Sequence, residues 1–228
     1  MSDGSSVVGS EIVTGHVETA VHGRYLLRAA PVAHTAPLIV GFHGYGENAS
    51  AILEALIQIP GIVGWHVASV QALHPFYNRR TGEVVASWMT KQDREQTIAD
   101  NVAYVARTVL AIGERVPVAG PTVYAGFSQG TAMTYRAAAH ASEACAGVIA
   151  LAGDVPPELA GEASWGRPPV LIGRGTGDEW YNEAKWEHDE SLLTSLGSEV
   201  ETCVFEGGHE WTGTFRRRAG SFLERLLS

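Results

Sequence analysis

The sequence predicts an α/β fold in which a mostly parallel central sheet is covered by helices on both faces. The first observation is a series of short, nearly continuous apolar runs, such as residues 37–42 and 147–151, which are typical of strands buried on both faces of a parallel sheet. The second is that segments with helical periodicity separate these runs. This strand–helix alternation after residue 36 implies crossover connections between parallel strands. For 228 residues, we expect a single domain over residues 1–228.

Each element follows from its local pattern. We expect residues 1–10 to be flexible and to precede two strands, residues 11–19 and 22–30, with Gly23 at the turn between them. The helix over residues 91–112 has the clearest pattern, an apolar stripe on one face. The expected buried strands are residues 37–42, 65–70, 122–125, 147–151, 170–173 and 200–205, and the expected helices are residues 51–59, 91–112, 129–141, 182–196 and 214–227.

Composition excludes several classes of protein. The 16 Lys and Arg residues are outnumbered by 25 Asp and Glu residues, which gives a formal net charge of −9 and argues against nucleic acid or anionic membranes as partners. Cys145 and Cys203 are the only cysteines, and no Cys/His spacing predicts a metal site, so we expect neither metal nor cofactor. We expect no signal peptide, and the sequence contains no run of ~18 apolar residues. We therefore expect a cytoplasmic protein without stable membrane insertion.

A candidate nucleophile lies in the stretch GFSQG at residues 126–130, which matches the pattern G-x-S-x-G. The stretch follows the expected strand 122–125 and opens the expected helix 129–141. In this strand–turn–helix context a serine is held in a strained turn with its hydroxyl exposed. The alternative is that Ser128 is only a helix N-cap, a position that serine favours. The context favours Ser128 as a nucleophile.

A serine nucleophile needs a base and an acid, and the strand–turn–helix geometry implies that they follow it in the order acid, then histidine. His209 lies in a loop between the last expected strand and the last expected helix, and we expect it to be the base. Asp178 follows the expected strand 170–173 and is the favoured acid, with Asp154 after the preceding strand as its competitor. The acid would hold the imidazole tautomer and stabilise the imidazolium.

The tetrahedral intermediate of such a reaction carries negative charge on oxygen, which backbone N–H groups stabilise. One donor is expected from Gln129, the residue after the nucleophile. We expect the second from Tyr45, because the first parallel strand ends in the turn HGYGEN at residues 43–48, whose glycines permit close approach of the backbone. His43 in this turn is expected to be a structural residue rather than a second base.

Together these features resemble the phospholipase/carboxylesterase family of α/β-hydrolases, the acyl-protein thioesterase-like enzymes, over about residues 36–228. The resemblance is carried by GFHGYG (41–46), SW (87–88), GFSQG (126–130), GVIAL with the following glycine (147–153), GTGD (175–178) and GH (208–209). It implies an α/β-hydrolase fold, a triad of Ser128, Asp178 and His209, and oxyanion donors at Tyr45 and Gln129.

The chain departs from the family pattern around the mouth of the site. It has Tyr45, Gly46 and Glu47 where the family usually has Leu-Gly-Asp. Four aromatic residues are expected to bind substrate near the acyl group: Phe76, Trp88, Trp180 and Tyr181. Since they would narrow the cleft, we expect acyl chains of roughly two to six carbons. The alternative is that Trp180 and Tyr181 only cover the helix that follows them. No large cap domain is expected, because only 17 residues separate the strand ending at residue 151 from residue 169.

The expected function is that of a serine carboxylesterase, which hydrolyses carboxylic esters, and thioesters or lysophospholipids by the same chemistry, through an acyl-enzyme. Its partner is then a small-molecule ester, and a homodimer is compatible with the sequence. A serine peptidase of the same fold is an alternative, because triad geometry does not name the leaving group. A non-catalytic α/β-hydrolase that only binds a small ligand is another.

Overall fold

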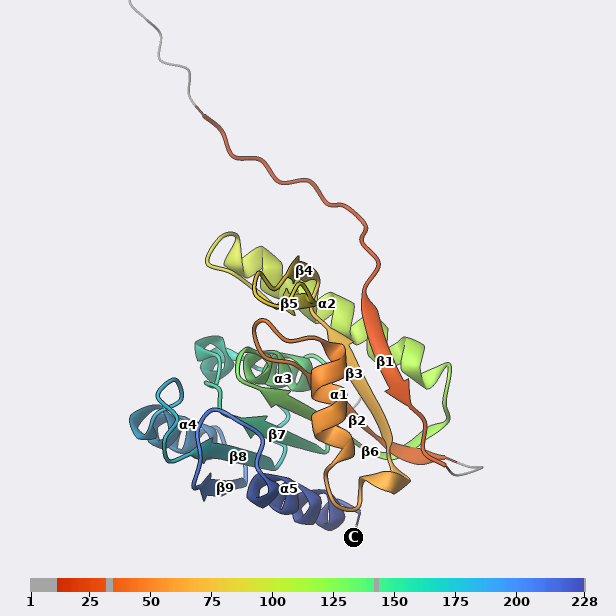
Figure 1. The fold of residues 1–228 in the computed structure, drawn as a ribbon, viewed down its shortest axis with the longest axis vertical. Helices are drawn as coiled ribbons and strands as arrows, with labels where there is room; N and C mark the ends of the chain where they lie inside the picture. Colours follow the sequence, from red (N-terminus) through yellow and green to blue (C-terminus); the bar gives the residue numbers. More distant parts are fainter. Residues whose placement is uncertain (1–11, 32–34, 142–143, 228) are drawn as a thin grey trace, which may run out of the picture.

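A computed structural model of the chain describes residues 12–31, 35–141 and 144–227. The strands of its main sheet are β1 (Arg24–Arg28), β2 (Ala36–Phe42), β3 (His66–Gln71), β6 (Val118–Phe127), β7 (Gly147–Leu151), β8 (Val170–Gly175) and β9 (Val200–Phe205). They lie in the order β1-β3-β2-β6-β7-β8-β9 (Figure 1). β1 pairs with β3 antiparallel, and the other neighbours pair parallel. The mostly parallel sheet is confirmed, whereas the expected flexibility of residues 1–10 lies outside the described residues.

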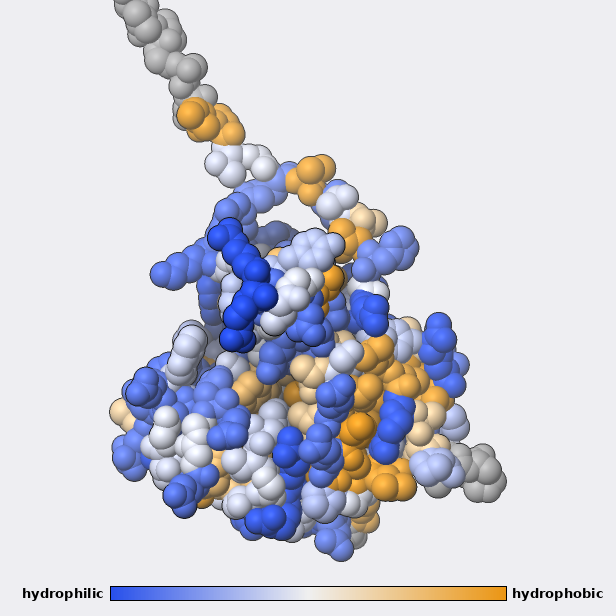
Figure 2. All heavy atoms as spheres, viewed as in Figure 1, coloured by the Kyte–Doolittle hydropathy of each residue, from blue (hydrophilic) through white to orange (hydrophobic). Residues whose placement is uncertain are grey.

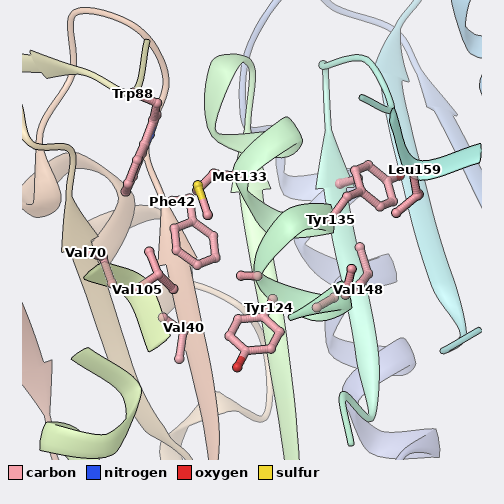
Figure 3. Packing of buried hydrophobic residues seen from close by; sticks show 14 of the residues in the cluster. Val40, Phe42, Val70, Trp88, Val105, Tyr124, Met133, Tyr135, Val148 and Leu159 are labelled. Carbon is pink, nitrogen blue, oxygen red and sulfur yellow. The ribbon is translucent and has the colours of Figure 1, made fainter. Parts of the chain in front are cut away.

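Helices cover both faces of this sheet. They are α1 (Ala49–Ile57), α2 (Arg94–Gly113), α3 (Gln129–Ala139), α4 (Glu183–Ser195) and α5 (Gly213–Arg225), with the short 3-10 helices η1 (Ile62–Gly64) and η2 (Pro157–Gly161). Since side chains alternate along a strand, Ile39 of β2 lies in a core cluster with α1 and α5, and its neighbour Val40 lies in a cluster with α2, α3 and α4. Figure 3 shows the second cluster, with Phe42 beside Met133 of α3. Burial on both faces explains the continuous apolar runs.

The N-terminal region differs from the prediction. Residues 12–19 form no strand. They extend away from the body of the molecule (Figure 1), and Figure 2 shows apolar side chains along this arm. Ile12 is 94% exposed, and Val13 and Val17 are similarly exposed. The loose alternation of residues 11–19 was an insufficient signal, because a strand also needs a neighbour to pair with. The second expected strand does have one, since β1 pairs with β3.

A second, two-stranded antiparallel sheet was not predicted. It is formed by β4 (His74–Tyr77) and β5 (Val84–Ser87). β4 is exposed along its length and contains Pro75, so it lacks the apolar run that indicates a buried strand. A β-bridge between Glu47 and Ala86 joins this hairpin to the loop after β2.

The parallel strands place the loops that follow β2, β6, β8 and β9 at one edge of the sheet, which is where α/β sheets bind their ligands. Between β7 and β8 the chain forms only the short helix η2, so no large cap covers this edge. Within the described segments, none of the helices combines the length and the apolar character needed to cross a bilayer.

Asn48 caps helix α1, which begins directly after the loop that follows β2. Its side-chain oxygen accepts hydrogen bonds from the N–H groups of Ser50 (3.0 Å) and Ala51 (3.1 Å). We expect Asn48→Ala to lower the free energy of unfolding by about 1 kcal/mol, because both N–H groups lose their acceptor. Denaturant unfolding measures the change. Asn48→Ser keeps a capping oxygen and should lose less; equal losses would contradict the capping role.

Candidate active site

The residues singled out by the sequence lie on four loops at the carboxyl edge of the sheet. Residues 43–48 follow β2, Ser128 follows β6, Asp178 follows β8 and His209 follows β9. Because β2, β6, β7, β8 and β9 run parallel, these loops meet on the same side of the sheet. Parallel pairing thus gathers residues that are far apart in the sequence.

Ser128 occupies a strained turn between β6 and α3. Its backbone has φ 52° and ψ −121°, a left-handed conformation that is costly for a residue with a Cβ atom. The turn is secured by a hydrogen bond from the Ser128 N–H to the Leu151 carbonyl (2.9 Å). Ser128 precedes the first residue of α3, but its side chain makes no capping hydrogen bond. The hydroxyl is therefore free, and helix capping does not account for this serine.

Asp178 and His209 form a hydrogen-bonded pair. The imidazole Nδ1 lies 2.8 Å from Asp178 Oδ2, and the other carboxylate oxygen accepts the N–H groups of Trp180 and Tyr181, both at 2.9 Å. The Asp178 side chain is 0% exposed, and these three donors replace bulk water around its carboxylate. Asp154, the competing acid, instead forms an exposed ion pair with Lys185 (3.1 Å).

Two aromatic rings hold the imidazole in place. The ring centroid of His209 lies 4.9 Å from that of Phe127 and 6.0 Å from that of Trp180. Phe127 directly precedes Ser128, so His209 packs against the end of the strand that leads into the candidate nucleophile. Neither Ser128 Oγ nor His209 Nε2 has a hydrogen-bond partner among the described residues. In enzymes without substrate this contact is often long, and it tightens in the Michaelis complex.

Two backbone N–H groups are available beside Ser128. Gln129 is the first residue of α3, and its N–H therefore has no partner within the helix. The N–H of Tyr45 has no partner among the described residues either. The two loops are adjacent, because a Cβ atom added to Gly44 would lie 3.3 Å from Ser128 Cβ. The arrangement can place both donors toward one oxygen atom, as an oxyanion hole requires.

The side chain of Gln129 has a structural role that the sequence did not predict. Its Oε1 accepts the N–H of Trp88 (2.9 Å), and its Nε2 donates to the carbonyl of Met89 (3.1 Å). Helix α3 is thereby tied to the segment after β5. The stretch SW at residues 87–88 was noted in the sequence, but nothing in its pattern named this partner.

The four aromatic residues expected at the substrate take different places. Trp88 is buried beside Phe42 (Figure 3). Tyr181 is buried and donates its hydroxyl to the Asp189 carboxylate (3.0 Å). Neither side chain presents surface to a bound ester in this structure. Trp180 and Phe76 are exposed at the surface.

Burial changes the charge state of two side chains in the loop after β2. It lowers the pKa of His43 to about 4, which a hydrogen bond to Gly44 only partly opposes, so the imidazole is neutral at physiological pH. Burial also raises the pKa of Glu47, against the effects of the Gly44 N–H and of positive charge on His209. Glu47 thus lies within electrostatic range of the candidate base. In the part of the chain that the structure describes, no three metal-binding side chains cluster.

Known proteins that are similar to this chain share its fold. The family model described as phospholipase/carboxylesterase matches residues 29–227. No curated protein matches the chain. Esterase PE8 is 20% identical, with a TM-score of 0.73, and the match covers 91% of this chain and 100% of that one. Acyl-protein thioesterase 2 of Zea mays is 18% identical, with a TM-score of 0.67, and the match covers 91% of this chain and 100% of that one. A carboxylesterase of Bacillus cereus is 17% identical, with a TM-score of 0.71, and the match covers 90% of this chain and 94% of that one. These similarities show the α/β-hydrolase fold.

The buried, neutral His43 predicts a pH dependence of stability. Its pKa is lowered from 6.5 to about 4 by folding, so the unfolded chain takes up the proton first as the pH falls. The stability linked to His43 is therefore present above about pH 6.5 and is lost toward pH 4, by at most about 3 kcal/mol. Denaturant unfolding measures the free energy of unfolding of the wild type and of His43→Gln. The difference between the two proteins should become smaller as the pH falls over this range. A difference that stays constant would contradict the prediction.

Proposed function

The chain belongs to the phospholipase/carboxylesterase family, and from this premise we propose that it is a serine carboxylesterase that forms an acyl-enzyme on Ser128. The observation that carries the proposal is the hydrogen bond between Asp178 and His209, at the sheet edge where Ser128 is held in a strained turn. Thioesters and lysophospholipids present the same carbonyl chemistry and fall within the proposed reaction.

The proposed reaction assigns one step to each group. His209 donates its Nδ1–H to Asp178, which leaves Nε2 to accept the proton of Ser128 as Oγ attacks the ester carbonyl carbon. The carbonyl oxygen becomes negative and is stabilised by the N–H groups of Tyr45 and Gln129. Collapse of this intermediate breaks the ester bond, and the departing alcohol takes the proton from His209. A water molecule then releases the acid by the same steps.

Exposed aromatic side chains near His209 and on the loop after β2 support the proposal that the substrate is of limited size. Trp180 is 75% exposed and its ring packs on His209. On the loop after β2, Tyr45 is 63% exposed, and its ring centroid lies 5.6 Å from that of Phe76. We expect these side chains to contact the substrate. A buried methylene gains about 0.8 kcal/mol only where space exists, and forcing one into a filled site costs about 1–3 kcal/mol.

Replacement of the nucleophile tests catalysis directly. We expect Ser128→Ala to lower turnover of an aryl ester by at least about 10³-fold, while the free energy of unfolding changes by no more than about 1 kcal/mol. A fluorophosphonate probe should label the wild type and a Ser50→Ala control but not Ser128→Ala. Near wild-type turnover by Ser128→Ala would refute the assignment, and an unlabelled wild type would indicate a binding protein without catalysis.

The two candidate acids give opposite expectations. Asp178→Asn should lower kcat by about 10²- to 10⁴-fold, because the imidazole loses the partner that sets its tautomer. Asp154→Asn should have little effect, since it removes only an exposed ion pair with Lys185. Steady-state kinetics of both variants decides between them. The reverse ranking would move the acid to Asp154.

A series of aryl esters from acetyl to palmitoyl tests the substrate size. We expect kcat/KM to peak at roughly two to six acyl carbons, because longer chains meet a filled site. Trp180→Ala should then shift the optimum to longer chains, with Tyr77→Ala, an exposed aromatic on β4, as the control. A steady rise toward palmitoyl in the wild type would exclude the narrow site. An unchanged optimum in Trp180→Ala would show that this residue does not line it.

A further inference from the structure

Two side chains fix the first peptide group of the loop after β2. The carbonyl of His43 accepts the indole N–H of Trp88 (2.9 Å), and the N–H of Gly44 donates to the Glu47 carboxylate (2.8 Å). A trans peptide keeps its C=O and N–H in one plane and pointing in opposite directions. Trp88 and Glu47 therefore bind the opposite edges of the same peptide group, between His43 and Gly44.

The next peptide group carries the N–H of Tyr45, the second expected oxyanion donor. Its carbonyl belongs to Gly44 and lies 2.7 Å from Nδ1 of His43. The same carbonyl accepts a longer turn hydrogen bond from the N–H of Glu47 (3.2 Å). Because the peptide is planar, the group that holds the Gly44 carbonyl also sets the direction of the Tyr45 N–H.

The other ring nitrogen determines the tautomer of His43. The N–H of Ala72, directly after β3, donates to His43 Nε2 (3.1 Å). Nε2 is thus an acceptor, so the proton of the neutral ring must be on Nδ1, from which it is donated to Gly44. The imidazole is fully buried, and water does not compete for either nitrogen.

We propose that His43 is a positioning residue for the oxyanion hole: its Nδ1–H holds the Gly44 carbonyl so that the Tyr45 N–H points toward the developing negative charge. The inference rests on the proposed esterase function. His43 acts through the peptide that it orients and is not a second base, because both ring nitrogens are already occupied.

Two substitutions separate the two nitrogens. The side-chain amide of Asn reaches the place of Nδ1, whereas that of Gln reaches the place of Nε2. His43→Asn therefore keeps a donor for the Gly44 carbonyl and loses the acceptor for Ala72. His43→Gln keeps the acceptor and loses the donor. Each variant retains one of the two hydrogen bonds, so they form a matched pair for stability.

We expect His43→Gln to weaken the stabilisation of the transition state and to leave substrate binding nearly unchanged. His43→Gln should lower kcat for an aryl ester about 10- to 100-fold, less than the 10²–10³ for a donor removed outright, because the turn hydrogen bond still restrains Gly44. KM should stay within about twofold. Affinity for a short-chain trifluoromethyl ketone, whose adduct with Ser128 bears an oxyanion, should fall in parallel with kcat. His43→Asn should retain most of the wild-type kcat and most of the affinity for the trifluoromethyl ketone.

A loss in His43→Asn as large as that in His43→Gln would overturn the proposal, because the ring would then serve the fold rather than the Gly44 carbonyl. ¹⁵N NMR of labelled histidines gives a test in the wild type, with the His43 signal assigned by its absence in His43→Asn. Nδ1 must carry the proton, and a proton on Nε2 would overturn the proposal whatever the activity. Failure of the esterase function looks different: the wild type would neither turn over esters nor react with a fluorophosphonate, and the oxyanion role would fall with it even with the proton on Nδ1.

Discussion

The left-handed backbone of Ser128 is the constraint on which the rest of the site depends. A residue with a Cβ atom stays in this conformation only where its surroundings leave no alternative. The neighbouring contacts supply that condition: a Cβ atom on Gly130 would lie 2.1 Å from the Phe42 carbonyl, and one on Gly153 would lie 2.2 Å from the Ser128 carbonyl. Around this turn, strand β2, helix α3 and the segment after β7 therefore pack so closely that their backbones are in direct contact. The same close packing brings the loop after β2 next to the Cβ atom of Ser128.

The proposed acid and base, Asp178 and His209, add an electrostatic constraint to this steric one. A buried carboxylate is costly unless hydrogen bonds replace its water. Asp178 receives two from the backbone N–H groups that follow it and one from His209. The backbone donors keep the carboxylate fixed, and the imidazole takes the remaining direction. Phe127 and Trp180 then pack against the imidazole ring.

The proposed oxyanion donors are supported by segments that are distant in the sequence. The side chain of Gln129 binds the segment after β5, and the indole of Trp88 in that segment binds the loop after β2. His43 connects that loop to the end of β3. The hydrogen bonds from Trp88 to the His43 carbonyl and from Ala72 to His43 are buried, and in a buried region hydrogen bonds are stronger and an unmade bond is more costly. In the proposed reaction these contacts would direct the donors before any substrate binds, which is the condition for efficient stabilisation of charge in a transition state.

The sequence by itself determined the strand–helix alternation, the family and the candidate nucleophile. These depend on local patterns: an apolar run predicts a buried strand wherever it lies, and GFSQG between a strand and a helix predicts the turn at Ser128. Tertiary structure alone decided that Asp178 and not Asp154 reaches the imidazole, that Trp88 and Tyr181 are buried, and that the Gly44 carbonyl and the Ala72 N–H face the two ring nitrogens of His43. It also decided that residues 12–19 form no strand, whereas the exposed β4 finds a partner in β5. Each of these outcomes depends on which groups meet across the edge of the sheet, and that is set by the packing of segments far apart in the chain rather than by the residues next to them.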